Sequence, residues 1–339
     1  SSDLTWEKAS TFNIGLDFTM LNQRLDFSFD WYQRTTSDML VKVEYPEVLG
    51  TTAPPANKAE LRTRGWEVSV KWNDRIGNDF SYDLGFILSD SQAEITKYEN
   101  PSGTLSDYYV GQKIGEIWGY ETEGFYQSDT DVQNHADQSK LGANWAPGDI
   151  MYKDLDGNKK INNGSNTLDD HGDLKVIGNT TPRYQYGITA NMSYKNVYLN
   201  VFFQGIGKRD FWPSSQPFWP VATQYYNTQK WFVTDSWSED NRDAYFARPI
   251  ARETKNQQKQ TKYLQDASYC RLKNLTVGYD FPKSWLSFLH VAKAGVYFSA
   301  ENLFEFTNVK GAYDPEAAGK NGTMVYPFQR TYSFGLNVT

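Results

Sequence analysis

Several residue types that would indicate common classes of protein are scarce in this 339-residue chain. Cys270 is the only cysteine, so no disulfide can form within the chain. The three histidines, His135, His171 and His290, are far apart and lack the spacing of zinc ligands. Acidic residues outnumber basic ones by 41 to 34, and the net charge of −7 argues against nucleic acid as a partner. No apolar run reaches about 18 residues, so we expect no membrane-spanning helix.

Sequence motifs of common enzymes are also missing. The chain contains no G-x-S-x-G, Walker A or G-x-G-x-x-G motif. A pair of acids could imitate a glycosidase site, but we expect the acids within strands to pair with Lys71 or Arg34 and to hold water. These acids are Asp17, Asp26, Asp30, Glu67 and Asp83. The sequence therefore predicts no catalytic residue and no enzyme.

What the chain has instead is a repeated alternation of apolar and polar residues, with many aromatic residues in the apolar rows. Side chains of a strand point to opposite faces in turn, so each such stretch predicts a strand with one apolar and one polar face. Aromatic residues crowd the ends of the apolar rows, and charges occupy the other face. This pattern is typical of a transmembrane β-barrel. The clearest rows are Phe12, Ile14, Leu16 and Phe18, and Trp66, Val68, Val70 and Trp72.

The alternation predicts nine strands separated by short and long breaks in turn. Barrels of outer membranes have short periplasmic turns and long extracellular loops, so the first strand should descend toward the periplasm. The last strand, with Phe328 and Phe334 on its apolar row, should end there. The long breaks lie at about 36–62, 95–181, 208–267 and 304–326. The predicted strands are 10–20, 25–35, 62–73, 79–92, 182–194, 197–207, 268–281, 293–303 and 327–339.

An odd number of strands that start and end in the same direction does not close into an antiparallel barrel. An open sheet would leave two unpaired edges in lipid, which is energetically prohibitive. We therefore expect an all-β fold in which residues 1–339 are the C-terminal portion, about nine antiparallel strands, of a larger transmembrane β-barrel.

Three stretches resemble the SusC/RagA type of TonB-dependent transporter from the outer membrane of Bacteroidetes. The first is LTWEKASTFNIGLDFTMLNQRLDFSFDWYQRTTSDML, from Leu4 to Leu40. The second is GDIMYKDLDGNKKIN, from Gly148 to Asn162, which continues as VIGNTTPRYQYGITANMSYKNVYLNVFFQG up to Gly205. The third is YCRLKNLTVGYDFP followed by GVYFSAENLFEFT, up to Thr307. The resemblance spans nearly the whole chain, and the loops differ most.

The resemblance implies a function and a set of partners. The chain would be the distal part of a 22-stranded barrel, and the plug domain and the first strands would lie outside it. The complete protein would import glycans or peptides across the bacterial outer membrane, with TonB acting through the absent N-terminal part. A SusD-like surface lipoprotein would cover the barrel. One departure is the ending Leu336-Asn337-Val338-Thr339, where such barrels usually end in an aromatic residue.

The sharpest local motif is DLDGNKKIN, from Asp154 to Asn162. Asp154, Asp156 and Asn158 place side-chain oxygens at positions 1, 3 and 5 of a tight loop, and the carbonyl of Lys160 comes at position 7, as in a calcium-binding loop. The sequence therefore predicts a candidate Ca²⁺ site in an extracellular loop. A turn whose Asp and Asn side chains cap their own backbone explains the same residues.

Two positions of this motif depart from an EF-hand loop. Lys159 stands where that loop has glycine, and Ser165 stands where it has a bidentate glutamate. If residues 163–172 are an insertion, the missing acid could come from a later position. The candidates are Asp169, Asp170 and Asp173.

The long break after residue 207 is rich in aromatic residues and proline. Pro213, Pro217 and Pro220 each remove a ladder donor, so Asp210 to Trp237 should be a loop outside the membrane. Its aromatic rings could stack on cargo, or they could pack the loop against itself, and the two interpretations are compatible. The predicted ligand-binding residues are Trp212, Phe218, Trp219 and Trp231.

A second class of function stays open on the residues alone: a soluble β-sandwich that binds carbohydrate or acts as an adhesin. A sandwich has short connections at both ends of its strands, so the alternation of short and long breaks favours the importer. Aromatic residues beside the short turns are predicted to form an interfacial girdle at the periplasmic headgroups. These are Trp72, Phe80, Tyr194, Phe281 and Trp285.

Overall fold

A computed structural model describes residues 4–41, 55–222, 227–287, 290–311, 313–318 and 328–339. Its main feature is a nine-stranded antiparallel sheet in which spatial neighbours follow the chain order. All nine predicted strands are therefore confirmed. They are β1 (Lys8–Met20), β2 (Leu25–Val41), β3 (Ala56–Ile76), β4 (Phe80–Lys97), β9 (Arg183–Tyr194), β10 (Val197–Lys208), β13 (Tyr269–Asp280), β14 (Ala294–Thr307) and β15 (Thr331–Val338).

The strand ends differ from the prediction where the alternation of apolar residues stops. β2 and β3 remain paired beyond the apolar rows. The first part of this extension carries polar residues on both faces, such as Gln33 and Arg34 of β2, so the two-residue apolar period ends there although the pairing continues. The last strand begins later than expected, and Phe328 precedes it rather than lying on its apolar row. The Phe328 ring lies 5.0 Å from the guanidinium carbon of Arg271.

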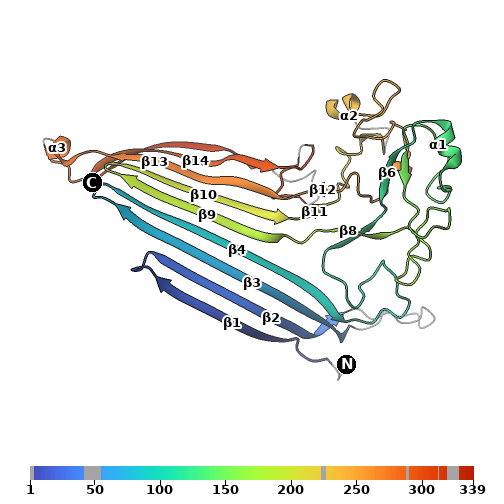
Figure 1. Cartoon of the computed structure of the whole chain (residues 1–339), viewed down its shortest axis with the longest axis horizontal. Helices are drawn as coiled ribbons and strands as arrows, with labels where there is room; N and C mark the ends of the chain where they lie inside the picture. The colour runs from blue at the N-terminus through green and yellow to red at the C-terminus, as the bar shows by residue number, and fades with distance from the viewer. Residues whose placement is uncertain (1–3, 42–54, 223–226, 288–289, 312, 319–327) are drawn as a thin grey trace.

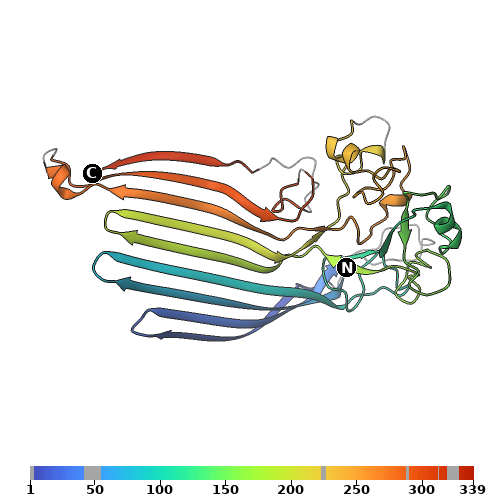
Figure 2. The ribbon, with the colours of Figure 1, turned by 45° about the horizontal axis from the view of Figure 1, so that its top comes forward.

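Short turns and long loops gather at opposite ends of the sheet, as the sequence predicts (Figure 1). The short turns and the helix α3 (Lys283–Leu286) lie at one end, which we call the turn end. The long segments after β4 and β10 lie at the other end, the loop end, in both views (Figures 1 and 2). β1 starts at the loop end and β15 finishes at the turn end, so both run in the predicted direction.

The pairing register separates the sheet into two faces. Trp66 of β3 lies opposite Trp31 of β2 in the apolar row, and Glu67 lies opposite Asp30 in the polar row. We call the face with the apolar rows the outer face and the face with the polar rows the inner face. The register from β1 to β4 is unbroken along the apolar rows, so each row stays on one face.

Tyrosine rings lie flat on the inner face, each across a glycine of the neighbouring strand. A Cβ atom built on Gly278 would lie 2.0 Å from Cζ of Tyr198, so no larger residue fits there without displacing the ring. The same arrangement occurs twice more on this face. The three pairs are Tyr32 with Gly65, Tyr198 with Gly278, and Tyr297 with Gly335.

The hydrophobic core lies in the loops at the loop end rather than in the sheet. Buried residues from the segments after β4 and β10 form one cluster that includes Ile150, Tyr152 and Tyr263. The loop elements are β5 (Glu116–Gly119), β6 (Thr122–Phe125), α1 (Asp129–Asn134), β7 (Ile150–Tyr152), β8 (Lys175–Asn179), β11 (Asp210–Phe211), η2 (Pro220–Ala222), α2 (Lys230–Thr234), η3 (Lys255–Gln257) and β12 (Gln265–Asp266). Over the described ranges, no helix is long and apolar enough to cross a bilayer.

Candidate functional site

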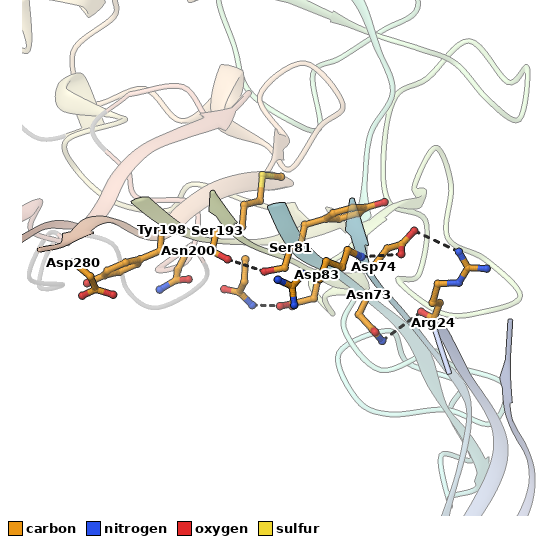
Figure 3. A pocket seen from close by; sticks show the side chains of 13 residues that line it. Arg24, Asn73, Asp74, Ser81, Asp83, Ser193, Tyr198, Asn200 and Asp280 are labelled. Atoms are coloured by element: carbon orange, nitrogen blue, oxygen red, sulfur yellow. Dashed lines mark hydrogen bonds and ion pairs between the residues drawn. The ribbon is translucent and has the colours of Figure 1, made fainter. Parts of the chain in front are cut away.

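A polar hollow of about 710 Å³ lies along the strands near the turn end (Figure 3). The hydroxyls of Ser81 and Ser193 are 2.7 Å apart, and the amide of Asn191 donates to Asp83 over 2.8 Å. Tyr198 adds the aromatic ring that lies across the glycine of β13. The inner face therefore offers hydroxyl, amide and carboxylate groups to water or to a polar solute.

The expected ion pairs of the inner acids are not formed. Among the described residues, none of the five acids named from the sequence makes an ion pair with Lys71 or Arg34. Asp26 lies directly opposite Lys71 in the register, but its carboxylate accepts a hydrogen bond from Thr19 over 2.7 Å. Asp83 accepts from Asn191 instead. Neutral donors on adjacent strands are nearer to these carboxylates than the ends of the long basic side chains.

At the loop end, one buried carboxylate joins the two longest loops. Asp149 is fully buried and accepts two hydrogen bonds from Arg248, over 2.8 and 2.9 Å. The ammonium group of Lys255 lies 3.1 Å from the same carboxylate, and Asn256 donates to it over 2.9 Å. The partners come from the segment after β10, about 100 residues further along the chain. The sequence shows no local signal for this link.

A partly exposed carboxylate, Glu121, makes a second cross-link within the loop region. Lys153 donates to it over 3.0 Å, and Lys175 at the start of β8 also pairs with it. Hydrogen bonds from Lys175 and then Lys153 hold the pKa of the Glu121 carboxyl below its usual range. This ion pair therefore strengthens the loop region only while the carboxyl is ionised.

The four predicted ligand-binding residues all belong to the aromatic cluster of the loops. Phe218 and Trp219 are buried, and the Phe218 ring packs against Trp219 at 4.7 Å and Trp231 at 5.8 Å between ring centroids. Trp212 and Trp231 are only partly buried at the edge of this cluster. The position of the loop at the loop end agrees with the prediction, and direct contact with cargo stays a prediction.

A segment that the sequence did not single out is fastened beside the inner face. The guanidinium group of Arg271 on β13 donates to Asp314 over 2.7 Å and to Glu316 over 2.6 Å. Lys273 also donates to Glu316, over 2.8 Å. The Arg271 side chain is only 2% exposed. The segment after β14 is therefore tied to the sheet by buried charge, which no spacing in the sequence reveals.

The candidate cation loop brings three of its predicted acids together. Side-chain oxygens of Asp154, Asp156 and Asp173 lie within 4.8 Å of one another. Asp173 is fully buried, and it accepts from the backbone of Leu155 over 2.7 Å and of Asn162 over 2.9 Å. Of the three late acids, it is thus Asp173 that reaches the motif.

The same loop also satisfies the self-capping interpretation. Asp154 accepts from the backbone of Gly157 over 2.8 Å, and Asn158 accepts from that of Lys160 over 2.7 Å. Lys159, at the position where a calcium loop has glycine, adopts the required left-handed conformation with φ of 64°. The carboxylates retain lone pairs beside these bonds, so the donor set fits a hard cation.

The three histidines stay apart in the structure. His135 contacts Glu123 at 3.2 Å in the loop region, and His171 lies against the ring of Trp118. Within the described ranges, the acids of the cation loop form the one grouping of His, Cys, Asp and Glu side chains with metal-binding spacing. The aromatic residues beside the short turns lie at the turn end as predicted, and Trp285 is 59% exposed.

These features define a class of protein. A single antiparallel sheet with an apolar and a polar face, short turns at one end and long loops at the other, is the wall of an outer-membrane β-barrel. The family model for the TonB dependent receptor-like β-barrel matches residues 1–303. The chain therefore belongs to this family and is a protein of the bacterial outer membrane. The alternative of a β-sandwich is wrong, since the strands form one sheet in chain order.

Individual relatives agree with the SusC/RagA resemblance. TonB-dependent receptor P3 of Formosa agariphila is 30% identical over all of this chain and 34% of the relative. TonB-dependent receptor SusC of Bacteroides thetaiotaomicron is 27% identical over all of this chain and 32% of its own. A solved structure of the RagAB peptide transporter matches 99% of this chain and 36% of its own, with 25% identity and a TM-score of 0.73. The chain spans about a third of the length of these relatives.

Proposed function

We propose that this chain forms part of the wall of an outer-membrane barrel that imports a nutrient. The observation that carries the proposal is the polar inner face, with its hydroxyl and amide groups, in a sheet whose other face is apolar. β1 and β15 lie at the two edges of the sheet, and every residue of β1 is exposed. Unpaired strand edges are too costly in lipid, so further strands outside these residues would close the barrel. A plug domain would occupy the closed barrel.

The cargo would be a glycan or a peptide. Hydroxyl and amide groups bond to either class, and the description of RagAB as a peptide transporter supports the peptide. TonB would supply the energy through a part of the protein outside these residues. A SusD-like surface lipoprotein would cover the loop end, as the resemblance to SusC/RagA-type transporters implies.

Two parts of the loop region would help to bind the cargo at the cell surface. Trp212 and Trp231, at the partly exposed edge of the aromatic cluster, would contact the cargo or the lipoprotein. The buried residues Phe218 and Trp219 would hold these two rings in place. The loop of Asp154 to Asp173 would bind Ca²⁺, which would fix the shape of this part of the extracellular surface.

A cysteine-blocking experiment tests the assignment of the inner face. In the full-length transporter with Cys270→Ser, we place one cysteine at Asn200 in the hollow or at Leu199, the next residue on the outer face. A maleimide carrying a long polyethylene glycol should reduce uptake of labelled oligopeptides or oligosaccharides several-fold for Asn200→Cys and leave Leu199→Cys unchanged. Equal effects at both positions would contradict an inner transport path.

Replacement of the two edge tryptophans tests the role of the loop. The double variant Trp212→Ala and Trp231→Ala should weaken uptake while the barrel still assembles in the outer membrane. Trp285→Ala is the matched control, because it removes an exposed tryptophan at the opposite end of the sheet. If uptake is unchanged in the double variant, these rings do not serve capture.

A further inference from the structure

The outer face carries an unusual group of cations just beyond the apolar rows. Trp31 and Trp66 lie opposite each other at the last apolar position of β2 and β3 toward the loop end. Arg64 and Arg62 follow on the same row of β3, two and four residues beyond Trp66. At about 3.4 Å per residue they lie roughly 7 and 14 Å from the tryptophan along the strand. Because the register of β3 with β4 is unbroken here, both arginines stay on the outer face.

These two arginines and the tryptophan pair line a pocket of about 210 Å³. Neighbouring segments bring further charges to the same pocket: Lys113 from the loop before β5, and Arg183 from β9. Two acids of β4 also line it, Asp90 and Glu94. We call this group of residues the outer basic pocket: Trp31, Trp66, Arg62, Arg64, Asp90, Glu94, Lys113 and Arg183.

The acids of the outer basic pocket do not balance its cations. The carboxylate of Asp90 is paired with Arg183, which donates to it from two nitrogens over 2.5 and 2.6 Å. Glu94 is shared by two cations, Lys113 at 2.6 Å and Arg62 at 3.5 Å. The pocket therefore holds four cations and two acids, an excess of two positive charges in a chain whose net charge is −7.

Arg64 is the cation with the weakest internal partner. Its Nε atom donates to the neutral amide oxygen of Gln33 over 2.8 Å. Among the described residues it makes no ion pair with an acid. A guanidinium group presents five donors in a planar fork that matches the oxygens of a phosphate, and Arg64 uses one of them here. Arg64 is exposed, so its remaining donors are accessible to a ligand.

The position of the pocket identifies the kind of anion. Aromatic residues at the end of an apolar row lie at the level of the lipid headgroups, and basic side chains beyond them reach the charged part of those headgroups. Clusters of basic side chains at the membrane surface attract anionic lipids, and the anionic group of such lipids is a phosphate in many cases. We propose that the outer basic pocket binds a phosphate group of an outer-leaflet lipid, with Arg62 and Arg64 as the main ligands and the tryptophan pair against its acyl chains.

Binding of lipid A to the purified full-length transporter in detergent tests this proposal. Native mass spectrometry would compare lipid A that carries its phosphates with the same lipid after phosphatase treatment. The double variant Arg62→Gln and Arg64→Gln should bind phosphorylated lipid A about 25-fold more weakly, since each basic residue contributes about a fivefold factor near an anionic headgroup. Glu94→Gln should strengthen binding several-fold, because it removes one acid from the pocket. Phosphatase-treated lipid A should bind all variants alike.

The matched control is Arg34→Gln with Lys71→Gln, which removes the same amount of charge from the inner face, at one position each of β2 and β3. This variant should bind lipid A within about twofold of the unmodified protein. If the double arginine variant behaves like the control, or if Glu94→Gln weakens binding, the proposal is wrong. Displacement of lipid A by millimolar inorganic phosphate would identify a site for free phosphate rather than for a lipid. If the double arginine variant loses a co-purifying protein but binds lipid A as the unmodified protein does, the pocket is a protein contact and the proposal is wrong.

Discussion

Replacing Asp149 by alanine should loosen the entire loop region, because this carboxylate joins its two longest segments. The substitution would leave Arg248 and Lys255 without their anion, and the Lys255 side chain is only 2% exposed. Removing one partner of a buried ion pair costs about 3–5 kcal/mol, since the remaining charge stays buried and unpaired. We expect a loss of this size in the local free energy of unfolding.

Hydrogen exchange of the full-length transporter in detergent measures this quantity segment by segment. A loss of about 3–5 kcal/mol corresponds to an increase of roughly 10²- to 10³-fold or more in the exchange of slowly exchanging amides. The increase should cover β7 and the buried part of the loops, where Ile150 donates to Asn256 over 2.9 Å. The strands β1 to β4, which lie outside this region, should exchange at their original rates.

Glu239→Ala provides the matched control. Glu239 pairs with Arg242 in the same region, but the two side chains are 70% and 51% exposed. A solvent-exposed ion pair contributes about 1 kcal/mol or less. If Asp149→Ala and Glu239→Ala increase exchange equally, or if Asp149→Ala destabilises the nine-stranded sheet to the same degree, the assignment of the buried link is refuted.

Three further predictions concern the sheet, the cation loop and the pH response. Val68→Lys on the outer face of β3 should destabilise the barrel by about 2–4 kcal/mol, whereas Ser69→Lys on the inner face should change little. Equal losses in urea-induced unfolding would contradict the orientation of the sheet. Millimolar Ca²⁺ should slow exchange across 154–173, and a structure should show six to eight oxygens at about 2.3–2.6 Å from the ion; Asp154→Asn should weaken both effects. An ordered loop without an ion in the same buffer would favour self-capping. Because the pKa of Glu121 is lowered in the folded protein, its ion pair stabilises the loop region above the ordinary carboxyl pKa of about 4.3 and is lost as the pH falls below it. Glu121→Gln should therefore flatten the fall in melting temperature between about pH 6 and pH 3.5, and a parallel fall in both proteins would contradict this.

The sequence alone determines the large sheet, because a strand with one apolar and one polar face has a local two-residue period. Each of the nine predicted strands is present, and the order of short and long breaks correctly predicts their directions. Asp154 and Asp156 of the cation motif are likewise local, whereas only the structure selects Asp173 among the three later acids. In each case the residues that interact lie close in the chain or follow a repeat, so the pattern is visible without coordinates.

The contacts that hold the loop region together are visible only in the tertiary structure. Asp149 meets Arg248 across 99 positions, and Arg271 meets Asp314 across 43, and neither separation leaves a period or a spacing in the sequence. The aromatic residues after β10 could pack on one another or face a ligand, and only the fold places Phe218 inside the cluster.

The outer basic pocket is an intermediate case. Arg62 and Arg64 continue the row of Trp66, so the two-residue period determines the face on which they lie. The sequence does not predict that Lys113 and Arg183 lie beside these arginines. Their positions depend on how the long loop after β4 folds back along that strand. A local repeat specifies which side chains share a face, whereas the closing of long loops decides which distant charges meet there.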